Sequence, residues 1–169
     1  MKLFGLSGWS GAGKTTLVVR LLPALATRGL TVSTMKHAHH DFDIDQPGKD
    51  SHRHRSAGAR EVMIASARRW ALMHEHGGAA EPTAAELAAR MAPVDLLLVE
   101  GFKREPHPTL EVHRAANGKP LLHPGDPHIV AVASDVPLRD VALPVLSLDD
   151  VEAIADFLVG HCGFAGRAA

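Results

Sequence analysis

Eight residues near the start of the chain have the composition and spacing of a phosphate-binding loop. They read Gly8-Trp9-Ser10-Gly11-Ala12-Gly13-Lys14-Thr15 and directly follow a short apolar run, residues 3–7. Glycines adopt backbone angles that other residues resist, so successive N–H groups can point inward and bind phosphate oxygens. The Lys14 side chain then reaches the β- and γ-phosphates of a nucleotide, and the Thr15 hydroxyl is a ligand for Mg²⁺. The chain is therefore expected to bind a nucleoside triphosphate in a P-loop.

Acidic residues next to predicted strands are candidates for holding Mg²⁺ or a water molecule. Glu100 ends the buried apolar run 96–99, which is where the second acidic motif of P-loop proteins lies. Asp95 begins the same run and is therefore expected at the opposite edge of the sheet. Three more candidates lie in the loop after the strand predicted at residues 30–35: Asp41, Asp43 and Asp45. The pattern alone leaves open which of these carboxylates acts and which are solvated loop acids.

The choice of base depends on one further carboxylate. Guanine offers an N1–H and an amino group, and a single carboxylate can accept from both. The usual [NT]-K-x-D element is missing, and the stretch 117–120, Asn-Gly-Lys-Pro, does not fit it. Asp135 follows the buried run 129–133 and is suitably placed by its order in the chain, although it also fits a turn aspartate before Pro137. We therefore expect GTP rather than ATP, with Asp135 as the candidate base contact.

Apolar runs alternating with helical patterns predict the fold. Strands are expected at residues 3–7, 30–35, 96–99, 110–113 and 129–133, and helices at 14–28, at 83–90 and from 149. A hairpin is expected over residues 61–66 and 69–73, and Asp50 is expected to cap a short helix. The fold class is α/β: a P-loop NTPase with a mainly parallel sheet flanked by helices and a small β-rich element. We predict a single domain over residues 1–169, with 60–75 and 105–125 as candidate β-rich or dimerisation insertions.

Composition excludes several other classes of protein. The 169 residues carry a formal net charge of -1, so no broad basic field points to nucleic acid or a membrane surface. One cysteine, Cys162, can form neither an internal disulfide nor a CxxC metal site. The chain starts directly with the first strand and has no apolar run of about 20 residues, the length that a membrane span needs. A cytoplasmic location is the expectation.

Histidines are concentrated in the polar stretch from His37 to Arg55. They are His37, His39, His40, His52 and His54. Imidazole is a good ligand for zinc, nickel and copper, but these spacings specify no metal site. Four basic residues share the stretch: Lys36, Lys49, Arg53 and Arg55. The sequence leaves open a metal site and a polar loop that touches an anionic ligand or water.

Three stretches together resemble the MobB family, the molybdopterin-guanine dinucleotide biosynthesis protein B family. They are residues 8–16; Lys-His-Ala-His-His-Asp at 36–41 with Asp-Gln-Pro-Gly-Lys-Asp-Ser at 45–51; and Val-Glu-Gly-Phe-Lys at 99–103. Residues 69–73 and 130–137 are also similar. The P-loop is common to many families, whereas the P-G-K-D-S and V-E-G-F-K segments are specific. The resemblance runs from Lys2 to about Val159.

This resemblance implies a dimeric GTP-binding protein with weak GTPase activity, acting beside the guanylyltransferase that couples GMP to molybdopterin. It implies an adaptor or a cofactor carrier, with a small β-rich element that contributes to the dimer. By motif, the nucleotide contacts are Gly8, Ser10, Gly11, Ala12, Gly13, Lys14, Thr15 and Thr16, with Asp135 as a candidate for the guanine. With Thr15, the candidate Mg²⁺ or water-positioning groups are Asp45 and Glu100, and these two with Lys14 are the candidate catalytic residues. The stretch from His37 to Arg55 becomes a candidate surface for the molybdopterin phosphate or a partner protein.

Two other functions remain open at this point. The histidines would suit a metallochaperone GTPase for nickel or another metal, although Cys162 is not part of a Cys-Pro-His element. Arg53, Arg55 and Arg60 could form part of the lid of a small-molecule P-loop kinase.

Overall fold

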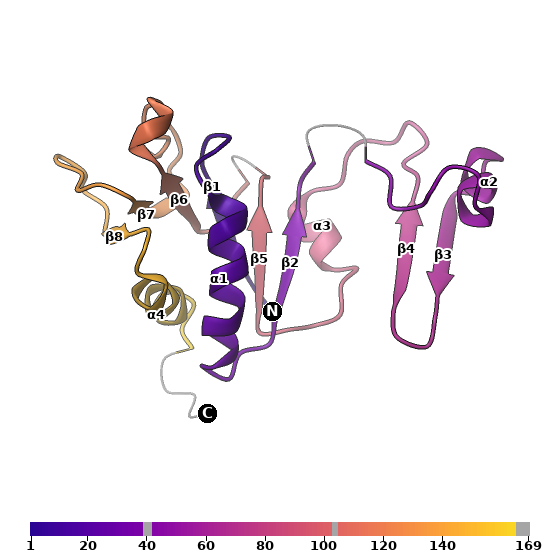
Figure 1. The fold of residues 1–169 in the computed structure, drawn as a ribbon, viewed down its shortest axis with the longest axis horizontal. Helices are drawn as coiled ribbons and strands as arrows, with labels where there is room; N and C mark the ends of the chain where they lie inside the picture. The colour runs from indigo at the N-terminus through magenta and orange to yellow at the C-terminus, as the bar shows by residue number, and fades with distance from the viewer. Residues whose placement is uncertain (39–41, 103–104, 165–169) are drawn as a thin grey trace. The chain divides into compact units, whose positions relative to one another are not determined.

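A computed structural model describes residues 1–38, 42–102 and 105–164 of the chain (Figure 1). The chain forms two compact units. The first comprises Met1–His37 with Thr83–Ala169, and the second comprises Ala38–Pro82. No helix in the described ranges has the length and apolar character needed to cross a membrane.

The first unit is built on a six-stranded parallel sheet in the order β2-β5-β1-β6-β7-β8. The strands are β1 (Lys2–Ser7), β2 (Val32–Lys36), β5 (Leu96–Glu100), β6 (Thr109–His113), β7 (Ile129–Ser134) and β8 (Val145–Ser147). Register aligns Leu6 of β1 with Glu100 of β5, and Ser7 of β1 with Glu111 of β6. The carboxyl ends of the strands therefore meet at one edge, where ligands of open parallel sheets bind. The predicted fold class is confirmed.

Helices cover both faces of this sheet. On one face, α1 (Lys14–Ala26) and α4 (Val151–His161) lie side by side (Figure 1). Their apolar side chains form one core with Phe4, Leu98 and neighbouring strand residues. On the other face, Ala84 and Ala88 of α3 (Ala84–Ala88) pack with Leu97 and Val99 of β5. The side chains of β5 point alternately to the two faces of the sheet. Because both faces are buried, the apolar run of this strand is unbroken.

The second unit contains α2 (Asp50–Ser56) and an antiparallel hairpin of β3 (Glu61–Ala65) and β4 (Trp70–His74). Met63 pairs with Leu72, and Ala65 pairs with Trp70, so these side chains share one face of the hairpin. Met63, Leu72 and Trp70 are exposed on that face. A two-stranded sheet is marginally stable alone.

Among three of the helix starts expected from the sequence, one is confirmed and two differ. Thr83 caps α3 through a capping box with Glu86, as predicted. The last helix is capped by Asp150, whose carboxylate accepts from the Ala153 N–H at 3.0 Å, so the predicted start at Asp149 is wrong by one residue. Asp50 is also not a cap, because it is the first residue of α2 and follows Lys49 at the N-cap.

The strand expected at residues 110–113 is present as β6, whereas the short strand β8 is not expected from the sequence. Residues 109–113 form β6 inside the parallel sheet, and the following loop contains two 3₁₀ turns, Ala115–Asn117 and His123–Gly125. The three-residue edge strand β8 lacks a distinct sequence signal because Val145 and Ser147 are exposed and only one short ladder holds it.

Candidate functional site

The glycine-rich loop connects β1 to α1 at the carboxyl edge of the sheet. Gly11 and Gly13 have φ values of 80° and 96°, in the left-handed region that favours glycine. Gly13 is the N-cap of α1, so the chain enters the helix from a left-handed residue without any side-chain cap. Thr15 and Thr16 lie in the first turn of α1, whose N–H donors have no acceptor inside the helix. This geometry is that of an anion-binding loop.

Gly8 fixes the loop against the neighbouring strand. Its φ is 147°, and a Cβ atom at this position would lie 2.4 Å from the carbonyl oxygen of Val112 in β6. Such a contact is far inside van der Waals distance and is made to backbone, which cannot rotate away. A side chain at position 8 would therefore displace either the loop or the end of β6.

The Lys14 ammonium lies over the loop. Its Nζ donates to the Gly8 carbonyl at 2.9 Å and to the Trp9 carbonyl at 3.2 Å, and the residue is partly buried. No acidic residue occupies the first turn of α1. The loop therefore presents a positive centre at the positive end of the helix dipole, which favours a bound anion.

Glu100 and Thr15 meet on the β5 side of the loop. The Thr15 hydroxyl donates to the Glu100 carboxylate, with Oγ1 lying 3.5 Å from Oε1 and 3.4 Å from Oε2. Lys36, the register partner of Glu100 at the end of β2, has its Nζ 3.6 Å from Oε1. Asp95 is at the opposite end of β5 and accepts from the backbone and hydroxyl of Thr31, as its position in the sequence predicts.

These two oxygen donors suit Mg²⁺, a hard cation that binds through one or two protein oxygens together with phosphates and waters. The Thr15 hydroxyl and the Glu100 carboxylate converge, and the Glu100 side chain is 15% exposed, so it remains accessible from the loop edge. When bound there, the cation would offset the charge of the terminal phosphates.

Arg114 and Asp135 lie on the opposite side of the loop, beyond β6 and β7. An Nη2 atom of Arg114 is 3.3 Å from the place that a Cβ atom on Gly13 would occupy. Asp135 accepts from the Ala115 N–H at 2.9 Å through Oδ1, and its Oδ2 lies 3.5 Å from Arg114 Nη1. The sequence identified Asp135 but missed Arg114, because only the register of β6 brings position 114 beside the loop.

The segment after β6 also supports the outside of the loop. The Trp9 indole N–H donates to the Pro120 carbonyl at 2.8 Å, and the Asn117 amide donates to the Ser10 carbonyl at 3.2 Å. The segment is anchored by Glu111, which is 1% exposed and accepts from the N–H groups of Leu122 and His123. The stretch 117–120 therefore holds the glycine-rich loop in place through these two hydrogen bonds.

Asp45 belongs to the second unit, where it forms an ion pair. Its side chain is 0% exposed, and its Oδ1 lies 2.9 Å from Arg55 Nη2. Arg55 also pairs with Asp43 at 2.6 Å and with Glu75 at 3.5 Å. The hydrogen bond to Asp45 is the largest cause that raises the pKa of Arg55. The contacts described for Asp45 are thus those of a residue that fixes its own unit, and its role toward Mg²⁺ stays a prediction.

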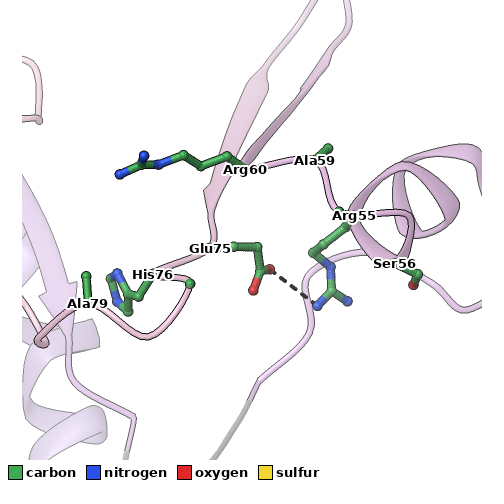
Figure 2. A pocket seen from close by; sticks show the side chains of 9 residues that line it. Arg55, Ser56, Ala59, Arg60, Glu75, His76 and Ala79 are labelled. Atoms are coloured by element: carbon green, nitrogen blue, oxygen red, sulfur yellow. Dashed lines mark ion pairs between the residues drawn. The ribbon is translucent and has the colours of Figure 1, made fainter.

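A hollow of about 660 Å³ lies beside this ion pair in the second unit. Arg55, Arg60, Glu75 and His76 contribute to its lining, and Figure 2 shows the Glu75 side chain directed at Arg55. Of the residues that line the hollow, only Arg55 belongs to the stretch from His37 to Arg55 in which the histidines are concentrated.

The histidines are only partly accounted for. The His37 ring lies 5.0 Å from the Phe102 ring, and the backbone N–H of His37 donates to the Glu100 carbonyl at 2.8 Å. His39, His40, Asp41 and Lys103 are outside the described residues. Within the three described ranges, no group of three or more His, Cys, Asp or Glu side chains is arranged to hold a metal ion.

Comparison with known proteins gives a consistent family. Residues 3–135 match the family model described as MobB: Molybdopterin guanine dinucleotide synthesis protein B. A molybdopterin-guanine dinucleotide biosynthesis adapter protein of Escherichia coli is 48% identical over 161 residues, covering 93% of this chain and 91% of the relative. One of Haemophilus influenzae, with the same description, is 40% identical over 159 residues, covering 92% and 86%. The crystal structure of a MobB homologue from Bacillus stearothermophilus has a TM-score of 0.71 at 25% identity, covering 97% of this chain and 99% of that one.

Gly8→Ala tests the contact between the loop and β6. The new Cβ would overlap the Val112 carbonyl oxygen and would also be strained by the positive φ. We expect a loss of about 2 kcal/mol or more in the free energy of unfolding, measured by urea denaturation. Gly125→Ala is the matched control, since a Cβ there meets no atom within 4 Å. Equal stability of the two variants would contradict the close approach.

Proposed function

The chain belongs to the MobB family of molybdopterin guanine dinucleotide synthesis proteins, and on this basis we propose that it is a GTP-binding adaptor with weak GTPase activity in that synthesis. The observation that carries the proposal is the arrangement at the start of α1. Lys14 lies over the loop, and Thr15 contacts Glu100 at the end of β5. The same edge thus offers a positive phosphate site and oxygen ligands for a cation.

Phosphate binding would draw on three kinds of group. The loop amides and Lys14 hold the triphosphate and stabilise the negative charge that develops during transfer. Thr15 and Glu100 would hold Mg²⁺, and Glu100 is also a candidate for orienting the attacking water. Thr16, in the first turn of α1, would be a further contact to the phosphates.

Slow GTP hydrolysis fits the absence of an arginine beside Glu100 among the described residues. The cation that lies near this carboxylate is the ammonium of Lys36. Phosphoryl transfer is accelerated about 10³- to 10⁵-fold where an arginine finger is supplied, often by a second protein. We therefore propose that hydrolysis is weak in the isolated chain. Separately, we propose that the guanylyltransferase of this synthesis is the partner protein.

Guanine specificity is proposed to involve Asp135. This carboxylate lies at the end of β7, and its side chain is 22% exposed. It already accepts one N–H and neighbours one guanidinium, yet a carboxylate has about four lone-pair positions, which leaves capacity for the N1–H and amino group of guanine.

The second unit is proposed to serve assembly. The apolar face formed by Met63, Leu72 and Trp70 is a suitable surface for a second copy of the chain, giving a homodimer. The polar stretch from His37 to Arg55 is proposed as the surface for the molybdopterin phosphate or the partner protein, with Asp45 as a further Mg²⁺ or water ligand.

The family assignment does not favour the two other functions. The E. coli and H. influenzae relatives are described as adapter proteins of dinucleotide synthesis, and neither is described as a metallochaperone or a kinase.

Lys14→Ala tests the proposed site. Removing a charge-assisted contact to phosphate costs about 1.5–3 kcal/mol, so we expect GTP affinity to fall by about ten- to a hundred-fold in isothermal titration calorimetry. Lys2→Ala, which changes an exposed lysine at the far end of β1, should leave affinity unchanged. Unchanged GTP binding by Lys14→Ala would remove the proposal.

Glu100→Gln tests the cation site. The wild-type chain should bind GTP more tightly with Mg²⁺ than with EDTA. The variant should lose most of that difference, about tenfold or more, because the carboxylate beside Thr15 becomes neutral. Glu152→Gln on α4 removes an equivalent charge away from the loop and should behave as wild type. A full Mg²⁺ effect in Glu100→Gln would place the cation elsewhere.

Leu72→Glu tests the homodimer. A charge in the middle of the apolar face should convert the wild-type dimer to a monomer in sedimentation velocity at micromolar concentration. Val19→Glu is the control, because Val19 is an equally apolar residue, 64% exposed, on α1 of the other unit. A monomeric wild-type chain, or a Leu72→Glu variant that remains dimeric, would contradict this use of the hairpin.

A further inference from the structure

We propose that Arg114 forms the nucleoside-side wall of the nucleotide site, with its guanidinium plane packed against the purine ring and held in place by Asp135. The inference rests on the proposed function, because it assumes that a nucleotide occupies the loop, and it assigns a residue to the half of that ligand farther from the cation.

The direction of the nucleotide follows from the sheet order. Thr15 and Glu100 meet on the side of β1 occupied by β5 and β2. These are the groups suited to the cation and the terminal phosphates, so the triphosphate has its outer end on that side. The nucleoside must then leave the loop on the other side of β1, above the carboxyl ends of β6 and β7.

Arg114 is located on that side. It is the first residue after β6, and its guanidinium lies against Gly13, with Nη2 3.3 Å and Nε 3.9 Å from the position of a Cβ atom on that glycine. Asp135, at the end of β7, fixes the other side of the group through Oδ2 at 3.5 Å from Nη1. The side chain is 40% exposed, so part of the guanidinium remains open to a ligand.

The charge of Arg114 is offset by a neighbouring carboxylate. A cation beside the amino end of a helix is electrostatically unfavourable by itself. Arg114 and Lys14 are both beside the start of α1, and the first turn of α1 contains no acid. Asp135 lies beside Arg114 and offsets its charge, so the guanidinium is expected to act on a ligand through its flat face rather than through its charge on the phosphates.

The chemistry of stacking favours arginine here. Purine rings pack against aromatic side chains or the flat guanidinium of arginine. Residues 114–136, which run from the end of β6 through β7 to the residues just after it, contain no Phe, Tyr or Trp. The Trp9 indole is directed to Pro120 and lies 5.7 Å from the Lys119 ammonium, on the outer side of the loop. Arg114 therefore offers a flat group on this side of the loop that can pack against the purine.

The test compares GTP with inorganic tripolyphosphate, which has the phosphates but no nucleoside. Binding of both is measured by calorimetry for the wild type, Arg114→Ala and Arg114→Lys. We expect both variants to bind GTP about tenfold more weakly and tripolyphosphate within about twofold of the wild type. Arg20→Ala, which removes a charge farther along α1, should change neither ligand.

The positioning role of Asp135 is tested in the same assay. If Asp135 acts on the purine partly by holding Arg114, the effects of Asp135→Asn and Arg114→Lys on GTP binding should be less than additive in the double variant. Arg114→Lys keeps the charge and guards against a folding defect in Arg114→Ala, and thermal unfolding without nucleotide should be close to wild type for it.

Three results with the Arg114 variants would overturn the inference. They are unchanged GTP affinity in both Arg114 variants, an equal loss for GTP and tripolyphosphate, and full GTP affinity in Arg114→Lys. An equal loss would mean that Arg114 acts only through its charge on the phosphates. A wild-type chain that bound tripolyphosphate but not GTP would likewise contradict it, whereas one that bound neither ligand would remove the proposed function first.

Discussion

The close approach of Gly8 to the Val112 carbonyl oxygen is the constraint on which the site depends. Only a residue without a Cβ atom fits between β1 and the end of β6, where that atom would be 2.4 Å from the oxygen. The loop can therefore turn back over the sheet edge and enter α1 through a left-handed Gly13. This places the positive start of α1 directly above the carboxyl ends of β5 and β6, so residues far apart in sequence meet there.

The sheet order gives the two sides of the loop different chemistry. On the β5 side, a hydroxyl and a carboxylate meet, Thr15 and Glu100, which suits a cation and terminal phosphates. On the β7 side, a guanidinium and a carboxylate meet, Arg114 and Asp135. The outer contacts of Trp9 and Asn117 with the segment after β6 hold the loop between these two pairs. A nucleotide bound as proposed would therefore have different groups at its two ends.

How much the sequence predicts depends on the range of the interaction. The P-loop is a local pattern, and Glu100 follows an unbroken apolar strand, so both could be found from spacing. The capping box of Thr83 is equally local. Arg114 could not be found, because its place depends on the pairing of β6 with β1 and on a bulge between β6 and β7. Asp45 was selected by motif, and the burial and Arg55 pairing that the structure adds are tertiary features.

The central claim is that main-chain amides of the loop bind a triphosphate, and amide resonances in ¹H–¹⁵N correlation spectra report on it directly. On titration with a non-hydrolysable GTP analogue and Mg²⁺, the largest shifts should occur at Gly11, Gly13, Lys14, Thr15 and Thr16, because phosphate oxygens become their acceptors. Shifts confined to other parts of the chain, with these five amides unmoved at saturation, would contradict the account.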